Sequence, residues 1–236
     1  MDFSFVKGRV EDIRELVSAA AARSGRDSAA IELLAVTKFQ PIEAARAAWD
    51  AGLRSFGESR VQEAETKYPG FLAEHPSARL DMIGHLQSNK AKKAVALFSR
   101  IESVDTLELL LELNSRARAA ELRPSVLLEL HTGEESKAGF LDADDLFRAL
   151  EIFLATEDRR IVPKGLMTMA PNSSDKTLVR SSFRSLRAAL EGARSRFGLP
   201  EFDVLSMGMS GDYQIAVEEG STLLRIGTAL FGAREA

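Results

Sequence analysis

Short apolar runs alternate with amphipathic helical stretches along nearly the whole chain, and this alternation limits the folds that the chain can adopt. Each run has the length and apolar density of a strand that is buried on both faces. The predicted strands are Ile31–Val36, Leu53–Phe56, Leu80–Ile83, Arg100–Val104, Pro124–Leu130, Ile161–Met169, Phe202–Leu205 and Leu223–Ile226. The strongest predicted helices are Phe3–Arg23, Pro41–Ala51, Thr106–Glu121, Ala143–Leu154 and Lys176–Phe197.

Eight alternating β and α units in a chain of 236 residues predict an α/β fold, a single (β/α)8 TIM-type barrel. An open doubly wound sheet is the alternative, but no GxGxxG motif follows the first strand to support it. We expect one domain over residues 1–236, because no repeat or linker divides the chain. Residues 1–25 are predicted to form an extra N-terminal helix that flanks the barrel.

The composition is that of a soluble globular protein, with 45% apolar and 28% charged residues. The net charge of -4, without a long run of either sign, argues against nucleic acid as the main partner. The absence of cysteine excludes disulfides and thiolate chemistry and fits a reducing cytoplasm. The three histidines lie at no metal-ligand spacing, and no stretch reads as a signal peptide or a membrane span. We therefore expect a cytoplasmic monomer that binds no membrane and no metal.

A lysine at the end of the first predicted strand is the strongest candidate for chemistry. The segment Ile31–Pro41 reads IELLAVTKFQP, an apolar run that stops one residue before Lys38. In a parallel barrel the functional residues lie at the C-terminal ends of the strands. Desolvation there lowers a lysine pKa toward neutrality, and a neutral amine attacks aldehydes and ketones. Lys38 is therefore a candidate Schiff-base lysine, and the alternative is a solvated lysine at a strand end.

Two glycine-rich loops after the seventh and eighth strands indicate a phosphate site. They read LSMGMSGD (Leu205–Asp212) and RIGTALFG (Arg225–Gly232). Barrels commonly bind phosphate at these two positions, where glycine lets the backbone approach and a helix N-terminus supplies N–H groups. Ser210 and Thr228 add hydroxyl donors. The alternative is that both residues only cap helices and that the glycines only serve turns.

Two further side chains lie where they can reach the mouth of the barrel. His85 follows the third strand in GHLQSNK. The sequence leaves two roles open for it, contact with a ligand and a structural role. Lys137 is a second amine, in GEESKAGF after the fifth strand. We favour a pairing of Lys137 with Glu134 or Glu135 over a chemical role.

Several motifs together resemble one known family. They read AVTKFQP, FGESRVQE, MIGHLQSNK, GEESKAGF, GLMTMAP and LSMGMSGDYQIAVEEGSTLLRIGTALFGAR, in this order from about Ile31 to Arg234. This set is similar to the YggS/PROSC family of pyridoxal phosphate homeostasis proteins. The resemblance implies a barrel like the N-terminal domain of bacterial alanine racemase, which holds the cofactor pyridoxal 5'-phosphate.

The resemblance also implies roles for individual residues. Lys38 would carry the cofactor as an internal aldimine. The other implied cofactor-binding residues are Ser210, Gly227 and Thr228 at the phosphate, Arg225 at the pyridine nitrogen, Met207 and His85 along the ring, and Ser59 beside the cofactor. Ser59 replaces an asparagine that is usual in the family, so an amide contact is lost there or a water takes its place. His131 likewise stands where the family often has asparagine, near Lys137.

The family resemblance implies a protein that carries or buffers pyridoxal phosphate for vitamin B6 homeostasis, with little or no catalysis. Its clients would be apoenzymes that depend on this cofactor. The chain ends soon after the eighth unit, so we expect no second domain to supply the opposing base of a two-base racemase. A racemase or decarboxylase on the same cofactor remains an alternative. A third hypothesis is an aldolase without a cofactor, in which Lys38 attacks a sugar-phosphate carbonyl.

Overall fold

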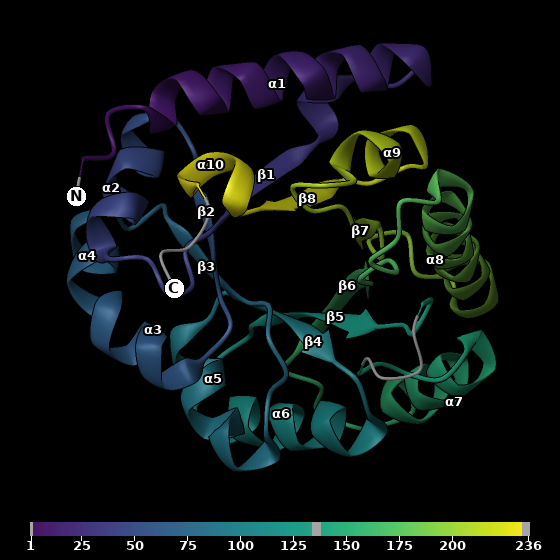
Figure 1. Cartoon of the computed structure of the whole chain (residues 1–236). Helices are drawn as coiled ribbons and strands as arrows, with labels where there is room; N and C mark the ends of the chain where they lie inside the picture. The colour runs from purple at the N-terminus through teal and green to yellow at the C-terminus, as the bar shows by residue number, and fades with distance from the viewer. Residues whose placement is uncertain (1, 134–137, 233–236) are drawn as a thin grey trace.

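Eight parallel strands close into a barrel in the order β1 to β8, in a computed structural model that describes residues 2–133 and 138–232 (Figure 1). The strands are β1 (Glu32–Val36), β2 (Ser55–Glu58), β3 (Arg79–Met82), β4 (Arg100–Val104), β5 (Ser125–Glu129), β6 (Val162–Met167), β7 (Val204–Ser206) and β8 (Leu223–Ile226). The first and last strands pair with each other and close the barrel: Leu34 of β1 pairs with Ser55 of β2 on one side and with Arg225 of β8 on the other. The predicted TIM-type barrel is confirmed.

Helices follow the strands and form the outer layer (Figure 1). They are α1 (Val6–Arg23), α2 (Ile42–Asp50), α3 (Val61–Lys67), α4 (Pro69–Glu74), α5 (Ala91–Leu97), α6 (Leu107–Ala119), α7 (Ala143–Leu154), α8 (Lys176–Phe197), α9 (Tyr213–Glu218) and α10 (Thr228–Phe231). Two short 3-10 turns complete the secondary structure: η1 (Ser28–Ala30) lies between α1 and β1, and η2 (Ser88–Lys90) lies between β3 and α5. Across residues 2–133 and 138–232, no helix has both the length and the apolar content that crossing a membrane requires.

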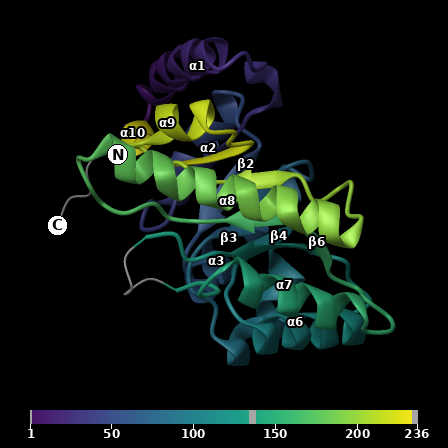
Figure 2. The same cartoon turned by 90° about the vertical axis from the view of Figure 1, so that its right-hand side faces the viewer.

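The extra N-terminal helix α1 lies on the outside of the barrel, across α2, α9 and α10 (Figures 1 and 2). Its buried face consists of Val6, Val10, Ile13, Val17, Ala20 and Ala21, which follow one stripe of the helix. The helix begins at Val6, three residues later than the predicted Phe3. Arg26, just after α1, donates hydrogen bonds to the Val217 and Ser221 carbonyls and ties this end of the helix to α9.

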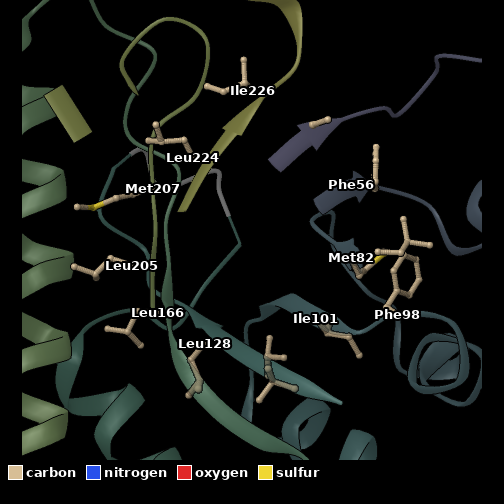
Figure 3. Close-up of a cluster of buried hydrophobic side chains, with 14 of the residues drawn as sticks. Phe56, Met82, Phe98, Ile101, Leu128, Leu166, Leu205, Met207, Leu224 and Ile226 are labelled. Carbon is tan, nitrogen blue, oxygen red and sulfur yellow. The ribbon is translucent and has the colours of Figure 1, made fainter. Parts of the chain in front are cut away.

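Two strands, β2 and β7, begin two residues later than predicted, because apolar residues of the preceding loops are also buried. Leu53 and Phe202 are 3% and 1% exposed, yet β2 starts at Ser55 and β7 at Val204. Their burial comes from packing against the helical layer, which periodicity alone does not separate from strand pairing. The main apolar core therefore lies between strands and helices, where Figure 3 shows Leu166 and Leu205 extending from the sheet toward the helices.

The interior of the barrel is charged. Strand residues that alternate with the outer apolar set project inward, and they include Asp81, Arg100, Glu102, Ser206 and Arg225, all at most 8% exposed. Arg100 donates to Asp81 Oδ2 from Nε at 2.9 Å and from Nη2 at 2.5 Å. The interior thus holds hydrogen-bonded ion pairs beside buried apolar residues such as Leu34 and Met167, which share the inward face with their register partners Arg225 and Ser206.

Candidate functional site

Lys38 lies in the turn that follows β1, at the end of the barrel where the strands terminate. The side chain is half-buried, and the next residue, Phe39, has a left-handed backbone with φ of 63°. Ala35 of β1 pairs with Phe56 of β2 and with Ile226 of β8. The Lys38 turn therefore emerges between the chain segments that follow β2 and β8.

The two glycine-rich loops lie together. The backbone N–H of Ala229, near the start of α10, donates to Ser210 Oγ at 3.0 Å and so joins the loop after β7 to the loop after β8. Gly227 packs against β1, since a Cβ at this position would lie 3.4 Å from Val36 Cβ. Thr228 is the first residue of α10 and is exposed. The turn that contains Lys38 and both glycine-rich loops therefore lie side by side at one end of the barrel.

Ser210 and Thr228 keep hydrogen-bonding capacity for an anion. Ser210 Oγ accepts from Ala229, and its own hydroxyl hydrogen donates to no acceptor among residues 2–133 and 138–232. In α10 the N–H groups of Ala229, Leu230 and Phe231 already donate to Ser210 Oγ or to the Gly227 carbonyl. Within the described residues this leaves the Thr228 N–H as a further donor. Hydroxyl and N–H donors around a glycine backbone are the groups that bind phosphate.

Arg225 is held rigidly inside the barrel, 4% exposed. Its Nη1 donates to the Ser206 carbonyl at 2.8 Å, and its Nη2 donates to the Thr168 carbonyl at 2.7 Å. Glu102 Oε2 lies 3.8 Å from Nη1 and accepts from Ser206 Oγ at 2.5 Å. Within the described ranges Nε of Arg225 has no hydrogen-bond partner. A fixed guanidinium thus keeps one donor for a ligand.

Glu129 is a site residue that the sequence reasoning missed. It ends β5 and is 3% exposed. Burial raises the pKa of this carboxyl to about 7, while the Arg225 guanidinium lowers it and the Asp105 and Glu102 carboxylates raise it further. Its signal in the sequence is an acidic residue at the C-terminal end of the apolar run Pro124–Leu130.

Ser59 and His85 lie at adjacent strand ends. Ser59 is half-buried and its backbone presses against Gly84, where a Cβ would lie 2.5 Å from the Ser59 carbonyl oxygen. His85 follows Gly84 and is 63% exposed at its side chain. Its Nδ1 lies 3.0 Å from Asp105 Oδ2. His85 is therefore oriented by a carboxylate at the rim, and its contact with a ligand stays a prediction.

The expectation that Met207 lines a ring pocket is wrong for its side chain. Met207 is 0% exposed and belongs to the apolar core, where Figure 3 shows it extending toward the helical layer. Successive strand residues point to opposite faces, so the inward neighbour Ser206 takes the position facing Arg225. Met209 is the methionine of this loop that is exposed, at 37%. Lys137 lies outside the described residues.

These features define a parallel barrel whose strand ends carry an amine, a pair of glycine-rich loops joined by a Ser210–Ala229 hydrogen bond, and a buried arginine. The chain belongs to the family described as alanine racemase, N-terminal domain, which matches residues 12–235. Within it the chain belongs with the pyridoxal phosphate homeostasis proteins, which confirms the resemblance found in the sequence.

Two curated relatives and one solved structure illustrate this membership. The pyridoxal phosphate homeostasis protein of Vibrio alginolyticus is 36% identical over 98% of this chain and 99% of its own length. The protein of the same name from Escherichia coli K12 is 38% identical over 94% of both chains. The structure of PipY from Synechococcus elongatus with pyridoxal phosphate bound superposes with a TM-score of 0.79 at 34% identity, over 92% of this chain and 100% of PipY.

Glu129→Gln is expected to stabilise the protein at pH 8 and to change little at pH 5. The folded protein holds the Glu129 proton more tightly than the unfolded chain does, with a pKa of about 7 against an ordinary 4.5. The stability that protonation contributes is therefore lost as the pH rises through 7, and glutamine avoids that loss of roughly 1–3 kcal/mol. Urea denaturation between pH 5 and 8 measures the difference, with the exposed Glu157→Gln as control. Parallel pH profiles for wild type and Glu129→Gln would contradict a buried, proton-binding Glu129.

Proposed function

We propose that this protein binds pyridoxal 5'-phosphate through a Schiff base with Lys38 and carries or buffers the cofactor in vitamin B6 homeostasis, without appreciable turnover. The observation that carries this proposal is the convergence of the Lys38 turn, the loop pair joined by Ser210 and Ala229, and Arg225 at one end of the barrel. The names of the Vibrio and Escherichia relatives and the cofactor bound in PipY support it.

The residues present fit the three polar parts of this cofactor. A phosphate is matched by the Ser210 hydroxyl and by the hydroxyl and N–H of Thr228. A pyridine nitrogen is matched by the Nε donor that Arg225 leaves without a partner in the described structure. An aldehyde is matched by the Lys38 amine. When bound, the cofactor supplies that aldehyde, to which amines add reversibly, so the same chemistry serves both capture and release to a client apoenzyme.

Arg225 also accounts for weak catalysis. The cofactor withdraws electrons best when its ring nitrogen is protonated, which an acidic partner promotes. An arginine guanidinium has donors only and is always charged, so it donates to that nitrogen and does not share a proton with it. The Ser206 and Thr168 carbonyls hold the guanidinium in place. Arg225 therefore keeps the position beside the ring nitrogen, and no acidic side chain can take it. The geometry favours binding over carbanion chemistry.

Lys38 is expected to be the residue that borohydride reduction labels with pyridoxyl. Its turn lies against the loop pair, because Gly227 packs on Val36. Peptide mass mapping after reduction identifies the labelled lysine. Lys38→Ala is expected to abolish the visible absorbance of the Schiff base, whereas the exposed Lys92→Ala leaves it unchanged. Label chiefly on Lys137, with Lys38 unmodified, would sink the assignment.

Ser210→Ala and Thr228→Ala are expected to weaken binding of pyridoxal phosphate selectively. A hydrogen bond to a charged group is worth about 1.5–3 kcal/mol, so each variant is expected to lose roughly tenfold or more in affinity. Pyridoxal lacks the phosphate, and its binding is expected to change little. Equilibrium titration with both ligands tests this, with Ser185→Ala on the exposed face of α8 as a control. Equal losses for the two ligands would place the phosphate elsewhere.

Negligible turnover of amino acids is the expectation that separates a carrier from a racemase. The loaded protein, incubated with L-alanine in deuterium oxide, is expected to exchange its bound amine without appreciable exchange of the alanine Cα hydrogen. The reason is that Arg225 leaves the ring nitrogen unprotonated, and a racemase tolerates this only with well-placed bases on both faces of the ring. Proton NMR follows the Cα signal and chiral chromatography follows D-alanine. Racemisation at ordinary enzymatic rates would overturn the carrier in favour of the racemase.

A further inference from the structure

A second lysine, Lys67, lies beside the turn that contains Lys38. It is the last residue of α3, and its side chain is only 9% exposed. Its Nζ donates to the Thr37 carbonyl at 2.8 Å and to the Gln40 carbonyl at 2.9 Å. These two carbonyls flank Lys38 and Phe39, so one ammonium group is hydrogen-bonded to the turn on both sides of them.

Two carboxylates complete the contacts of this ammonium. Lys67 Nζ lies 2.6 Å from Glu58 Oε1 and 3.1 Å from Glu63 Oε1. Glu58 is fully buried, and burial raises its pKa while the Lys67 ammonium lowers it. Glu58 Oε1 also accepts from Thr37 Oγ1 at 2.7 Å, and the Tyr68 hydroxyl lies 2.6 Å from that same Oγ1. The network anchors the first residue of the turn to β2 and to Tyr68, which lies between α3 and α4.

Glu63 fixes the middle of the turn. Its Oε1 accepts from the Phe39 N–H at 2.7 Å as well as from Lys67. Phe39 has φ of 63°, a left-handed conformation that costs a residue with a side chain roughly 1–2 kcal/mol. The Glu63 hydrogen bond compensates for this cost. Thr37, Phe39 and Gln40 are therefore each held from α3, and Lys38 is the turn residue between them.

Lys67 itself is unsuited to react with an aldehyde. An ammonium group has three N–H donors, and here four oxygens lie within 3.1 Å of it. Loss of the proton would leave Glu58 buried beside a neutral amine, which is a costly arrangement. Lys67 is therefore a fixed cation, and its effect on chemistry passes through the turn.

We propose that Lys67, with Glu63, is a positioning residue that holds the Thr37–Gln40 turn in the conformation from which the Lys38 amine reaches an aldehyde. This inference rests on the proposed function. In the reaction the Lys38 nitrogen forms a bond to the aldehyde carbon and loses two protons, and the aldehyde oxygen leaves with them as water. Lys67 forms no bond to the ligand. A turn that is free to move would lower the rate of this step without weakening the phosphate contacts, which lie on other loops.

The test separates Schiff-base formation from ligand binding. The variants are Lys67→Met, the milder Glu63→Gln, and Lys93→Met, which removes an exposed ion pair between Lys93 and Glu65 and serves as control. The rate of Schiff-base formation with pyridoxal phosphate is measured by visible absorbance. Affinity for 4'-deoxypyridoxine 5'-phosphate, which has no aldehyde, reports the binding site alone. Amide hydrogen exchange at Phe39 in the cofactor-free protein reports the turn.

Lys67→Met and Glu63→Gln are expected to slow Schiff-base formation roughly tenfold to a hundredfold, the scale of a small misplacement of reacting groups. Affinity for the deoxy analogue is expected to stay at the wild-type level, and the Phe39 amide is expected to exchange faster. Lys67→Arg is expected to restore part of the rate, because a guanidinium keeps the charge and the donors.

Two results overturn the inference in distinguishable ways. The positioning role is overturned if Lys67→Met and Glu63→Gln form the Schiff base at the wild-type rate. It is also overturned if their rate falls only in proportion to their affinity for the analogue. Either result leaves the proposed function standing. A wild-type protein that binds the analogue but forms no Schiff base at Lys38 would overturn the proposed function, and the positioning role with it.

Discussion

The ion pairs inside the barrel are the interactions on which the rest of this structure depends. Arg100 is bound to Asp81, Arg225 is bound to Ser206 and Thr168, and Glu102 lies between the two guanidiniums, 3.5 Å from Arg100 Nε and 3.8 Å from Arg225 Nη1. Buried charges are tolerated only where they are paired and hydrogen-bonded, so no member of this set is replaceable on its own without a large penalty. Burial raises the pKa of the Asp81 carboxyl, and the Arg100 guanidinium lowers it. Most of the apolar packing that stabilises the fold lies outside this set, in the layer between strands and helices.

A charged interior has a direct consequence for the mouth of the barrel. Arg225 belongs to the structural network, yet it lies on β8, the strand that leads into Gly227 and α10. Its orientation is set before any ligand arrives, because two backbone carbonyls hold its Nη atoms. Donors that are fixed in advance cost nothing to organise when a ligand binds. The same interactions that make the interior stable therefore prepare one donor at the site, and they also prevent an acid from taking that place.

Much of the fold was predictable, because local signals and tertiary packing agree. The strands Arg100–Val104 and Leu223–Ile226 and the helices α7 and α8 were predicted with both ends correct, since Asp142 and Asp175 cap the helix starts and Gly198 ends α8 in a left-handed conformation. The grouping of Lys38 with the two glycine-rich loops followed from barrel topology. Met207 was placed at the ring by the family resemblance, and nothing in the sequence showed that its side chain is buried in the apolar core. Glu129 and Lys67 were missed for a different reason: burial of a charged side chain depends on partners that are remote in the sequence, such as Arg225 and Thr37.

Lys38 and Lys67 show why residue type alone does not assign chemistry. Both are lysines near the end of β1, and a pattern in the sequence does not distinguish a nucleophile from a fixed cation. The distinction arises from their surroundings. Lys67 Nζ contacts two backbone carbonyls and two carboxylates, whereas Lys38 lies in the turn that these contacts hold in place. If the charge of Lys67 were not locked by Glu58 and Glu63, two amines near one mouth would compete for the same aldehyde. The buried carboxylates thus do two things at once. They stabilise the turn that presents one lysine, and they form ion pairs with the other.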